Sequence, residues 1–229
     1  MIISERKGFA FIHNPKCGGT SVRSCLLKFD TINDFFWHIS TTDDGKSFDR
    51  AHIPMVYLRR YFKEYYNLLD SLFVFMFVRN PYEKCISAFN QVTNSEFLKA
   101  VERNEGSAQS GAKETYVHEI NSFIMRLDEK VINGCYPEYV HFVRQCDMAY
   151  VGSKRKADLI LKLEIFYSEI EKLSFFSRDL ALLLKNAGRE NERPRWFNRI
   201  EDVLWSDTIK KINSLYEDDF CLFDYDRIQ

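Results

Sequence analysis

The sequence predicts a three-layer α/β fold in which helices flank a central, mostly parallel sheet. Three short runs, at residues 9–13, 73–78 and 159–163, are almost continuously apolar, as expected for parallel strands covered on both faces. Helical patterns lie between these runs, and such alternation is typical of right-handed crossovers. We predict helices at residues 20–29, 55–69, 82–91, 116–127 and 167–185.

The rest of the chain gives weaker signals. A short extra strand is predicted near residues 36–39, and residues 207–215 form an amphipathic helical pattern followed by an aromatic tail that we expect to be packed. Polar residues dominate two stretches, 102–113 and 186–199, which we expect to be exposed loops of the length that lids and binding segments have. No repeat or linker interrupts the chain, so we predict one domain over residues 1–229.

Composition excludes several classes of protein. The 229 residues are 45% hydrophobic and 28% charged, which is typical of a globular chain rather than a disordered one. The net charge of −1 argues against a nucleic-acid partner, so any anion must be held by local charge. No apolar run approaches the roughly 18 residues that a membrane span needs, and the apolar stretch near the start is too short for a cleavable signal. We therefore expect a cytoplasmic protein without a transmembrane segment.

The cysteine spacing argues against both a zinc site and a disulfide framework. None of the cysteines forms a CxxC or CxxxxC pair, which structural zinc sites usually contain. One lies in a glycine-bearing loop and two on predicted helices, so we expect reduced thiols, as in a cytosolic protein. The six are Cys17, Cys25, Cys85, Cys135, Cys146 and Cys221.

A strand, a glycine-bearing turn and a helix start follow one another in FAFIHNPKCGGTSV, residues 9–22. Backbone N–H groups without partners at a helix N-terminus point at an anion, and Lys16 adds a full charge. The ATP-binding pattern GxxxxGK[ST] places lysine directly before Ser or Thr, whereas here Lys16 precedes Gly18 and Gly19. A kinase or ATPase also needs an acidic group for Mg²⁺, and Arg79 follows the strand that should supply it. The ATP hypothesis is therefore the weaker one.

A second junction of this kind is FVFMFVRNPYEKCISAF, residues 73–89. Arg79 ends the strand, and Ser87 lies inside the next helix. Two oxyanion-binding corners on neighbouring strands suit a ligand that carries two separated phosphate-like groups.

The first motif, HNPKCGGTSV, resembles the 5′-phosphosulfate loop of the Golgi-type and bacterial carbohydrate sulfotransferases. FVRNPYEKCISAF resembles their 3′-phosphate motif, an arginine followed eight residues later by a serine. ADLILKLEIFYSEI and SLYEDDFCLFDYD resemble later stretches of the bacterial members, less specifically. The resemblance implies a P-loop-like fold, a bacterial protein, and 3′-phosphoadenosine 5′-phosphosulfate as donor, with adenosine 3′,5′-bisphosphate as product and no metal.

The same resemblance assigns roles to the motif residues. The loop wraps the 5′-phosphosulfate, and Lys16 neutralises charge on the departing bisphosphate. Arg79 and Ser87 hold the 3′-phosphate. Cys17 is a loop residue and not a nucleophile. The donor-binding set is Lys16, Cys17, Gly18, Gly19, Thr20, Ser21, Arg79 and Ser87.

Transfer also needs a base, and the family usually places a histidine between the two motifs at the opening of a helix. His52 fits, because Pro54 suits the first turn of the helix predicted after it. His38 is the alternative, and His13 lies beside the loop and shapes it. His118 and His141 have no supporting context.

The acceptor is expected to be a carbohydrate or another small hydroxyl-bearing molecule, since this branch of the family mostly sulfates sugars. Arginines in the 186–199 stretch either close over the nucleotide, with an aromatic ring on the base, or form a solvated turn. Two other functions stay open, a nucleotide-dependent kinase and a non-catalytic nucleotide-binding relic, as does the oligomeric state. In the 186–199 stretch the candidate residues are Arg193, Arg195, Arg199, Trp196 and Phe197, and Glu190 and Glu192 would balance the arginine charges in a solvated turn. Glu164 lies elsewhere, at the end of a predicted strand, and is expected to be structural.

Overall fold

The computed structural model describes residues 1–41, 45, 47–93, 98–99, 109–133, 136–137, 139–187 and 196–229. The chain forms two compact units. The first contains Met1–Arg79 and Ile132–Glu190, and the second contains Asn80–Val131 and Asn191–Gln229. We describe each unit by itself, and the single domain expected from the sequence stays a prediction.

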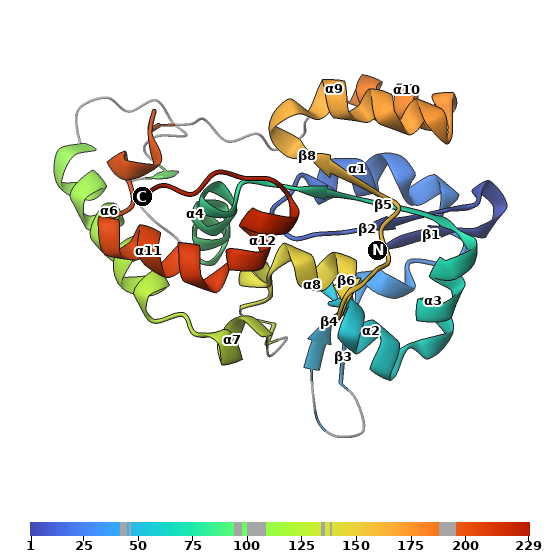
Figure 1. Ribbon diagram of the computed structural model, residues 1–229, viewed down its shortest axis with the longest axis horizontal. Helices are drawn as coiled ribbons and strands as arrows, with labels where there is room; N and C mark the ends of the chain where they lie inside the picture. Colours follow the sequence, from blue (N-terminus) through green and yellow to red (C-terminus); the bar gives the residue numbers. More distant parts are fainter. Residues whose placement is uncertain are drawn as a thin grey trace. The chain divides into compact units, whose positions relative to one another are not determined.

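A four-stranded sheet forms the centre of the first unit (Figure 1), in the order β1 (Ile2–Ser4), β2 (Phe9–Ile12), β5 (Phe73–Val78) and β8 (Leu159–Lys162). β2, β5 and β8 are parallel, and only β1 runs antiparallel to its neighbour. In the register, Ile12 faces Met76 and Val78 faces Lys162, so the carboxyl ends of the three parallel strands lie at one edge. The α/β class and the three parallel strands are therefore confirmed.

Helices cover both faces of this sheet (Figure 1). α1 (Gly19–Leu26), α9 (Phe166–Glu171) and α10 (Arg178–Ala187) lie on one face, and α2 (Met55–Tyr61) and α8 (Gln145–Ala149) on the other. Because strand side chains alternate between faces, every second residue of the strands joins the first of these layers. The resulting buried cluster includes Phe9, Phe11, Phe75, Phe77 and Leu161 from the sheet with Val22, Leu26, Phe166, Ile170 and Leu184 from the helices.

Two predicted helices are each broken in the structure. The one expected at residues 55–69 is α2 followed by α3 (Lys63–Leu68), because Phe62 leaves helical geometry and packs its ring edge-on against Phe35. The one expected at 167–185 is α9 followed by α10, where the Ser177 hydroxyl accepts a hydrogen bond from the amide of Leu180 at 3.3 Å and starts a new helix.

Several short strands were missed, or in the case of the strand at Ile39–Thr41 predicted only in part, by the sequence patterns. Besides β1, these are β3 (Ile39–Thr41) with β4 (Ser47–Asp49), and β6 (Tyr150–Val151) with β7 (Lys154–Arg155). The strand expected near residues 36–39 is wrong over its first part, where a 3₁₀ turn forms. Such turns lie at Glu5–Lys7, Leu27–Phe29, Phe35–Trp37, Arg50–His52, Leu69–Ser71, Val140–Phe142, Leu163–Ile165, Lys172–Phe175 and Ile200–Asp202, and α7 covers Glu129–Asn133.

The second unit is helical, with α4 (Pro81–Val92), α6 (Gln109–Met125), α11 (Ser206–Leu215) and α12 (Glu217–Leu222). The α4 N-terminus is capped by Asn80, whose Oδ1 accepts from the amide of Tyr82 at 3.0 Å. The aromatic tail is packed, as predicted, with Phe220 and Tyr216 buried. The loop expected at residues 102–113 is wrong from residue 109 onward, because α6 already begins there; residues 102–108 lie outside the described part.

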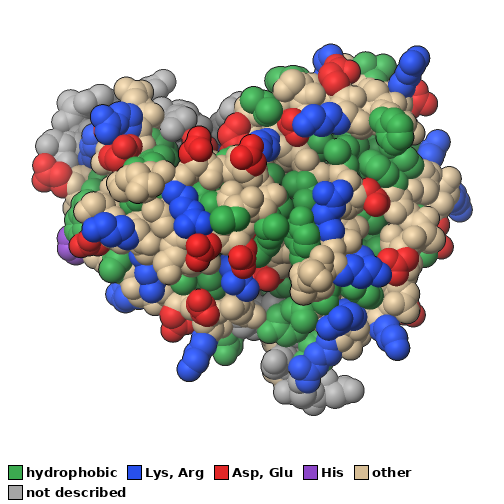
Figure 2. All heavy atoms as spheres, viewed as in Figure 1, with side chains coloured by type: hydrophobic (Ala, Val, Ile, Leu, Met, Phe, Trp, Pro, Cys, Tyr) green, Lys and Arg blue, Asp and Glu red, His purple; other side chains and the backbone are tan. Residues whose placement is uncertain are grey.

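No helix in the described part of the chain is long and apolar enough to cross a membrane. On the face that Figure 2 displays, lysine and arginine side chains are interspersed with aspartate and glutamate, with apolar side chains between them. This mixture agrees with the net charge of −1.

Candidate functional site

The chain turns sharply between β2 and α1, at the carboxyl edge of the sheet. Two residues in this turn have left-handed backbones, Lys16 with φ 62° and Gly18 with φ 73°. Glycine adopts this conformation without cost, whereas a lysine there is strained by roughly 1–2 kcal/mol. Strain of this kind persists only where the surroundings impose it, and it is typical of ligand-binding loops.

The turn delivers the chain to the start of α1 at Gly19, where the first amides have no acceptor within the helix. Gly18 and Thr20 are exposed, Lys16 is partly buried and Ser21 is buried. An ammonium group, two hydroxyl side chains and helix-terminal amides therefore come from one short segment. This set of donors suits an oxyanion such as a phosphate or a sulfate.

The two glycines are needed for different reasons. A Cβ on Gly18 would lie 2.8 Å from Cδ1 of Leu163, in addition to the positive φ. A Cβ on Gly19 would lie 1.9 Å from Cδ2 and 2.2 Å from Nε2 of His13, which is closer than any real contact. The imidazole of His13 thus packs directly on the first residue of α1.

Arg79 follows β5, the strand next to β2, and its side chain reaches this turn. The guanidinium Nη1 donates to the carbonyl oxygen of Lys16 at 3.5 Å. The structure therefore brings together the two predicted motif residues of the first unit, Lys16 and Arg79. Ser87 is partly buried on α4 in the second unit, and its role stays a prediction.

A residue that the sequence did not single out, Gln145, joins the two motifs. Its Oε1 accepts from the amide of Arg79 at 2.8 Å, from Asn14 Nδ2 at 3.2 Å and from Cys17 Sγ at 3.2 Å. Its Nε2 donates to the carbonyl of Arg79 at 2.8 Å. Cys17 is buried and held as a hydrogen-bond donor, in agreement with its interpretation as a loop residue. No sequence motif surrounds Gln145, so only the fold reveals it.

His52, the predicted base, lies in the 3₁₀ turn Arg50–His52 before α2, and Pro54 is the N-cap of α2 rather than part of its first turn. Its Nδ1 lies 3.0 Å from the carbonyl oxygen of His13. Because a carbonyl oxygen only accepts, Nδ1 carries the proton, and Nε2 is the basic nitrogen of the neutral ring. Ring centroids of His52 and His13 are 4.6 Å apart, and those of His52 and His141 are 5.5 Å apart.

His13 is 4% exposed, and no other described residue partners its Nδ1. Burial first, and then the nearby His52, hold the pKa of His13 well below its usual value, so its ring is neutral near pH 7. The ring stacks on Trp37 with centroids 5.6 Å apart, and the guanidinium of Arg23 lies 3.8 Å from the Trp37 centroid. This column of rings fixes His13 against the start of α1.

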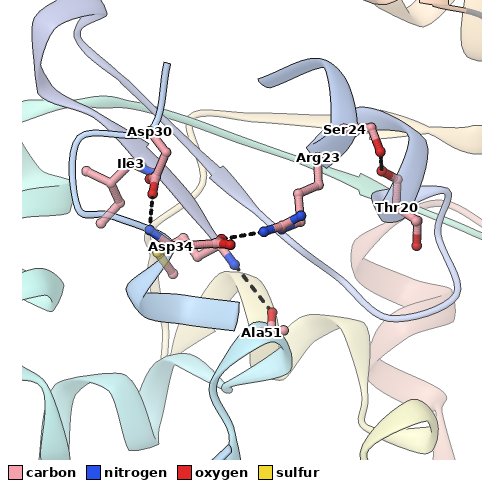
Figure 3. Close-up of polar contacts among 8 residues, drawn as sticks. Ile3, Thr20, Arg23, Ser24, Asp30, Asp34 and Ala51 are labelled. Atoms are coloured by element: carbon pink, nitrogen blue, oxygen red, sulfur yellow. Dashed lines mark hydrogen bonds and ion pairs between the residues drawn. The ribbon is translucent and has the colours of Figure 1, made fainter. Parts of the chain in front are cut away.

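Figure 3 shows how α1 is tied to the neighbouring segment. The guanidinium of Arg23 forms an ion pair with the carboxylate of Asp34. The backbone amide of Asp34 donates a hydrogen bond to the carboxylate of Asp30 at 2.7 Å. Asp30 also accepts from the amide of Ile3 in β1 at 3.1 Å. These contacts attach the helix that follows the turn to the edge strand of the sheet.

The other candidates are less well placed. His38 is exposed, and its carbonyl oxygen accepts hydrogen bonds from Nε and the backbone amide of Arg50. In the second unit, Trp196 packs edge-on against Tyr116 with centroids 5.3 Å apart. Arg199 pairs with Glu201 at 3.1 Å, which raises the pKa of Arg199. Arg193, Arg195, Glu190 and Glu192 lie outside the described residues, as does Cys135; no disulfide joins the five cysteines that the structure describes.

Comparison with known proteins gives one match. A family model described as "Sulfotransferase family" matches residues 1–226 of the chain. No curated protein and no solved structure matches it.

Proposed function

Because the chain belongs to the sulfotransferase family and is therefore a transferase, we propose that it moves a sulfuryl group from 3′-phosphoadenosine 5′-phosphosulfate to an acceptor hydroxyl. One observation carries the choice of donor: the Arg79 guanidinium lies 3.5 Å from the carbonyl of Lys16, where two adjacent parallel strands end. Two cationic side chains that start from neighbouring strand ends suit a ligand with an anionic group at each end.

In this proposal the loop binds the 5′-phosphosulfate through the amides of residues 18–21, the hydroxyls of Thr20 and Ser21, and the ammonium of Lys16. Arg79 binds the 3′-phosphate with its planar fork, and the role of Ser87 remains the one that the motif resemblance implies. The donor set of the described loop fits such oxyanions, since it consists of N–H, O–H and cationic groups. Fixed cations and amides take the part that Mg²⁺ has in phosphoryl transfer.

The proposed reaction is an in-line displacement at sulfur. The acceptor oxygen attacks sulfur, the bond between sulfur and the bridging phosphate oxygen breaks, and adenosine 3′,5′-bisphosphate leaves. His52 takes the acceptor proton on Nε2, and the fixed tautomer of His52 supports this role. Lys16 neutralises the charge that develops on the leaving oxygen. His38 is the less favoured base because the residue is exposed.

We propose a carbohydrate, or another small hydroxyl-bearing molecule, as acceptor, and one cytoplasmic sulfotransferase domain as the working unit. The kinase alternative requires ATP with Mg²⁺. The relic alternative requires bisphosphate binding without turnover on any acceptor.

Calorimetry separates these functions. We expect adenosine 3′,5′-bisphosphate to bind without Mg²⁺ and more tightly than ATP, and Lys16→Ala to weaken that binding by about tenfold or more, the scale of one charge-assisted hydrogen bond. Lys28→Ala, at an exposed lysine shortly after α1, is the matched control and should bind as the wild type does. Preference for ATP with Mg²⁺ would overturn the proposal. Turnover is then tested with labelled donor and a panel of sugars.

A further inference from the structure

Gln145 is the first residue of α8, and its side chain is fully buried at 0% exposure. It lies 66 residues beyond Arg79 in the sequence and 128 beyond Cys17, yet it contacts both. Burying a side-chain amide costs free energy unless its donors and acceptors are hydrogen-bonded. The hydrogen-bond partners of Gln145 therefore indicate its structural role.

The orientation of the Gln145 amide is fixed by backbone groups of known polarity. The N–H of Arg79 can only donate and therefore faces Oε1, while the C=O of Arg79 can only accept and therefore faces Nε2; both distances are 2.8 Å. This pair of bonds is what a neighbouring strand would give to a residue of the ladder. Gln145 thus extends sheet-like pairing by one residue beyond the end of β5, at the position of Arg79.

The same amide also holds the turn after β2. Oε1 accepts from Asn14 Nδ2 and from Cys17 Sγ, each at 3.2 Å, and Asn14 Nδ2 donates in addition to the carbonyl of Phe77 at 2.9 Å. Asn14 and Cys17 lie on either side of the strained Lys16. One buried group therefore contacts the segments that carry both cationic side chains of the candidate site.

We propose that Gln145 is a positioning residue for the donor: it sets the spacing between the 16–21 loop and Arg79, and hence between the two anion-binding groups. This inference rests on the proposed function, because it takes the ligand to be an adenosine bisphosphate. Gln145 acts through Arg79 and the loop. A spacing error of even a fraction of an ångström weakens two-point binding, since both ends of a rigid ligand cannot then be satisfied together.

Gln145→Met keeps the volume of the side chain and removes its polar atoms. We expect this variant to bind adenosine 3′,5′-bisphosphate about tenfold more weakly than the wild type by calorimetry, with one end of the ligand poorly held. The matched control is Met148→Ala, on the same short helix and 1% exposed, which opens a cavity but removes no hydrogen-bonding group. It should lower the denaturation midpoint and leave the dissociation constant within about twofold of the wild type.

A mutant cycle with Arg79→Ala provides a readout that a merely structural role would not move. If Gln145 acts through Arg79, most of the tenfold effect of Gln145→Met disappears in the Arg79→Ala background. Gln145→Asn, which keeps the amide but withdraws it by one methylene, replaces the methionine variant if that protein does not fold, and should also weaken binding. Unchanged affinity in a folded Gln145 variant overturns the positioning role alone. Wild-type protein that fails to bind the bisphosphate overturns the positioning role and the proposed function together.

Discussion

Replacement of Gly19 by alanine tests the geometry on which the candidate site depends. Gly19 is the first residue of α1, a position where alanine usually stabilises a protein because it restricts the unfolded chain. Here the new Cβ would lie 1.9 Å from Cδ2 and 2.2 Å from Nε2 of His13. We therefore expect Gly19→Ala to destabilise the protein, against the general trend.

The magnitude follows from how far His13 must move. Ordinary contacts of a Cβ begin near 3.4 Å, so the ring would have to retreat by about 1.5 Å. It has little room, because it is stacked on Trp37 and lies edge-on to His52 at 4.6 Å. Overpacking of this kind destabilises a protein by about 1–3 kcal/mol. The restricted backbone of alanine in the unfolded chain offsets up to about 1 kcal/mol of this loss. We expect the free energy of unfolding to fall by about 1–2 kcal/mol.

Urea denaturation measures this loss, with Gly111→Ala in α6 as the control. Apart from its chain neighbours and the backbone of α6 itself, no heavy atom of the described residues lies within 4 Å of a Cβ at Gly111, so alanine there should raise the free energy of unfolding by about 0.5–1 kcal/mol. In a His13→Ala background, where no ring obstructs the new Cβ, the cost of Gly19→Ala should vanish. A Gly19→Ala protein as stable as the wild type would refute the packing of His13 on α1.

Three further predictions concern the charged and titrating groups. Arg79→Ala should weaken adenosine 3′,5′-bisphosphate binding by about 1.5–3 kcal/mol in calorimetry, whereas Arg59→Ala, at an exposed arginine of α2, should not; equal affinities would remove Arg79 from the site. His52→Ala should lower turnover by about 10²–10⁴ with donor affinity retained, and loss of folding would mark His52 as structural. Because the pKa of buried His13 is lower in the folded protein than in the unfolded chain, the unfolded chain takes up a proton at a higher pH. The burial of neutral His13 therefore carries no protonation cost above pH about 6.5, and the free energy of unfolding falls as the pH drops below that value. Urea midpoints between pH 7 and 5 should show a slope that His13→Phe reduces and His38→Gln leaves unchanged.

Local sequence patterns predicted the parts of the fold that depend on local physics. β5 has the bounds expected from its apolar run, and α1 and α4 begin within one residue of their predicted starts. The patterns failed where a tertiary contact decides the outcome. The break at Phe62 depends on a ring 27 residues away, and β1 is a strand only because β2 pairs with it.

The candidate site shows the same division. A lysine and paired glycines between a strand and a helix predict an anion-binding loop, because all the binding groups come from consecutive residues. Gln145 could not be found this way, since a glutamine is usually a surface residue and no motif surrounds it in the sequence. Gln145 contacts Arg79, Asn14 and Cys17 because α8 packs near the ends of β2 and β5, and this packing is a tertiary feature.

The turn and the proposed base are one connected structure. Gly19 lacks a side chain because the ring of His13 occupies that space, and the carbonyl of His13 fixes which nitrogen of His52 carries the proton. A displacement of His13 by the 1.5 Å or so that an added Cβ demands would therefore disturb the orientation of His52 as well as the start of α1. It follows that Gly19→Ala should lower turnover by more than it weakens donor binding. A variant that loses donor affinity but keeps the wild-type rate at saturating donor would show that His52 does not depend on His13.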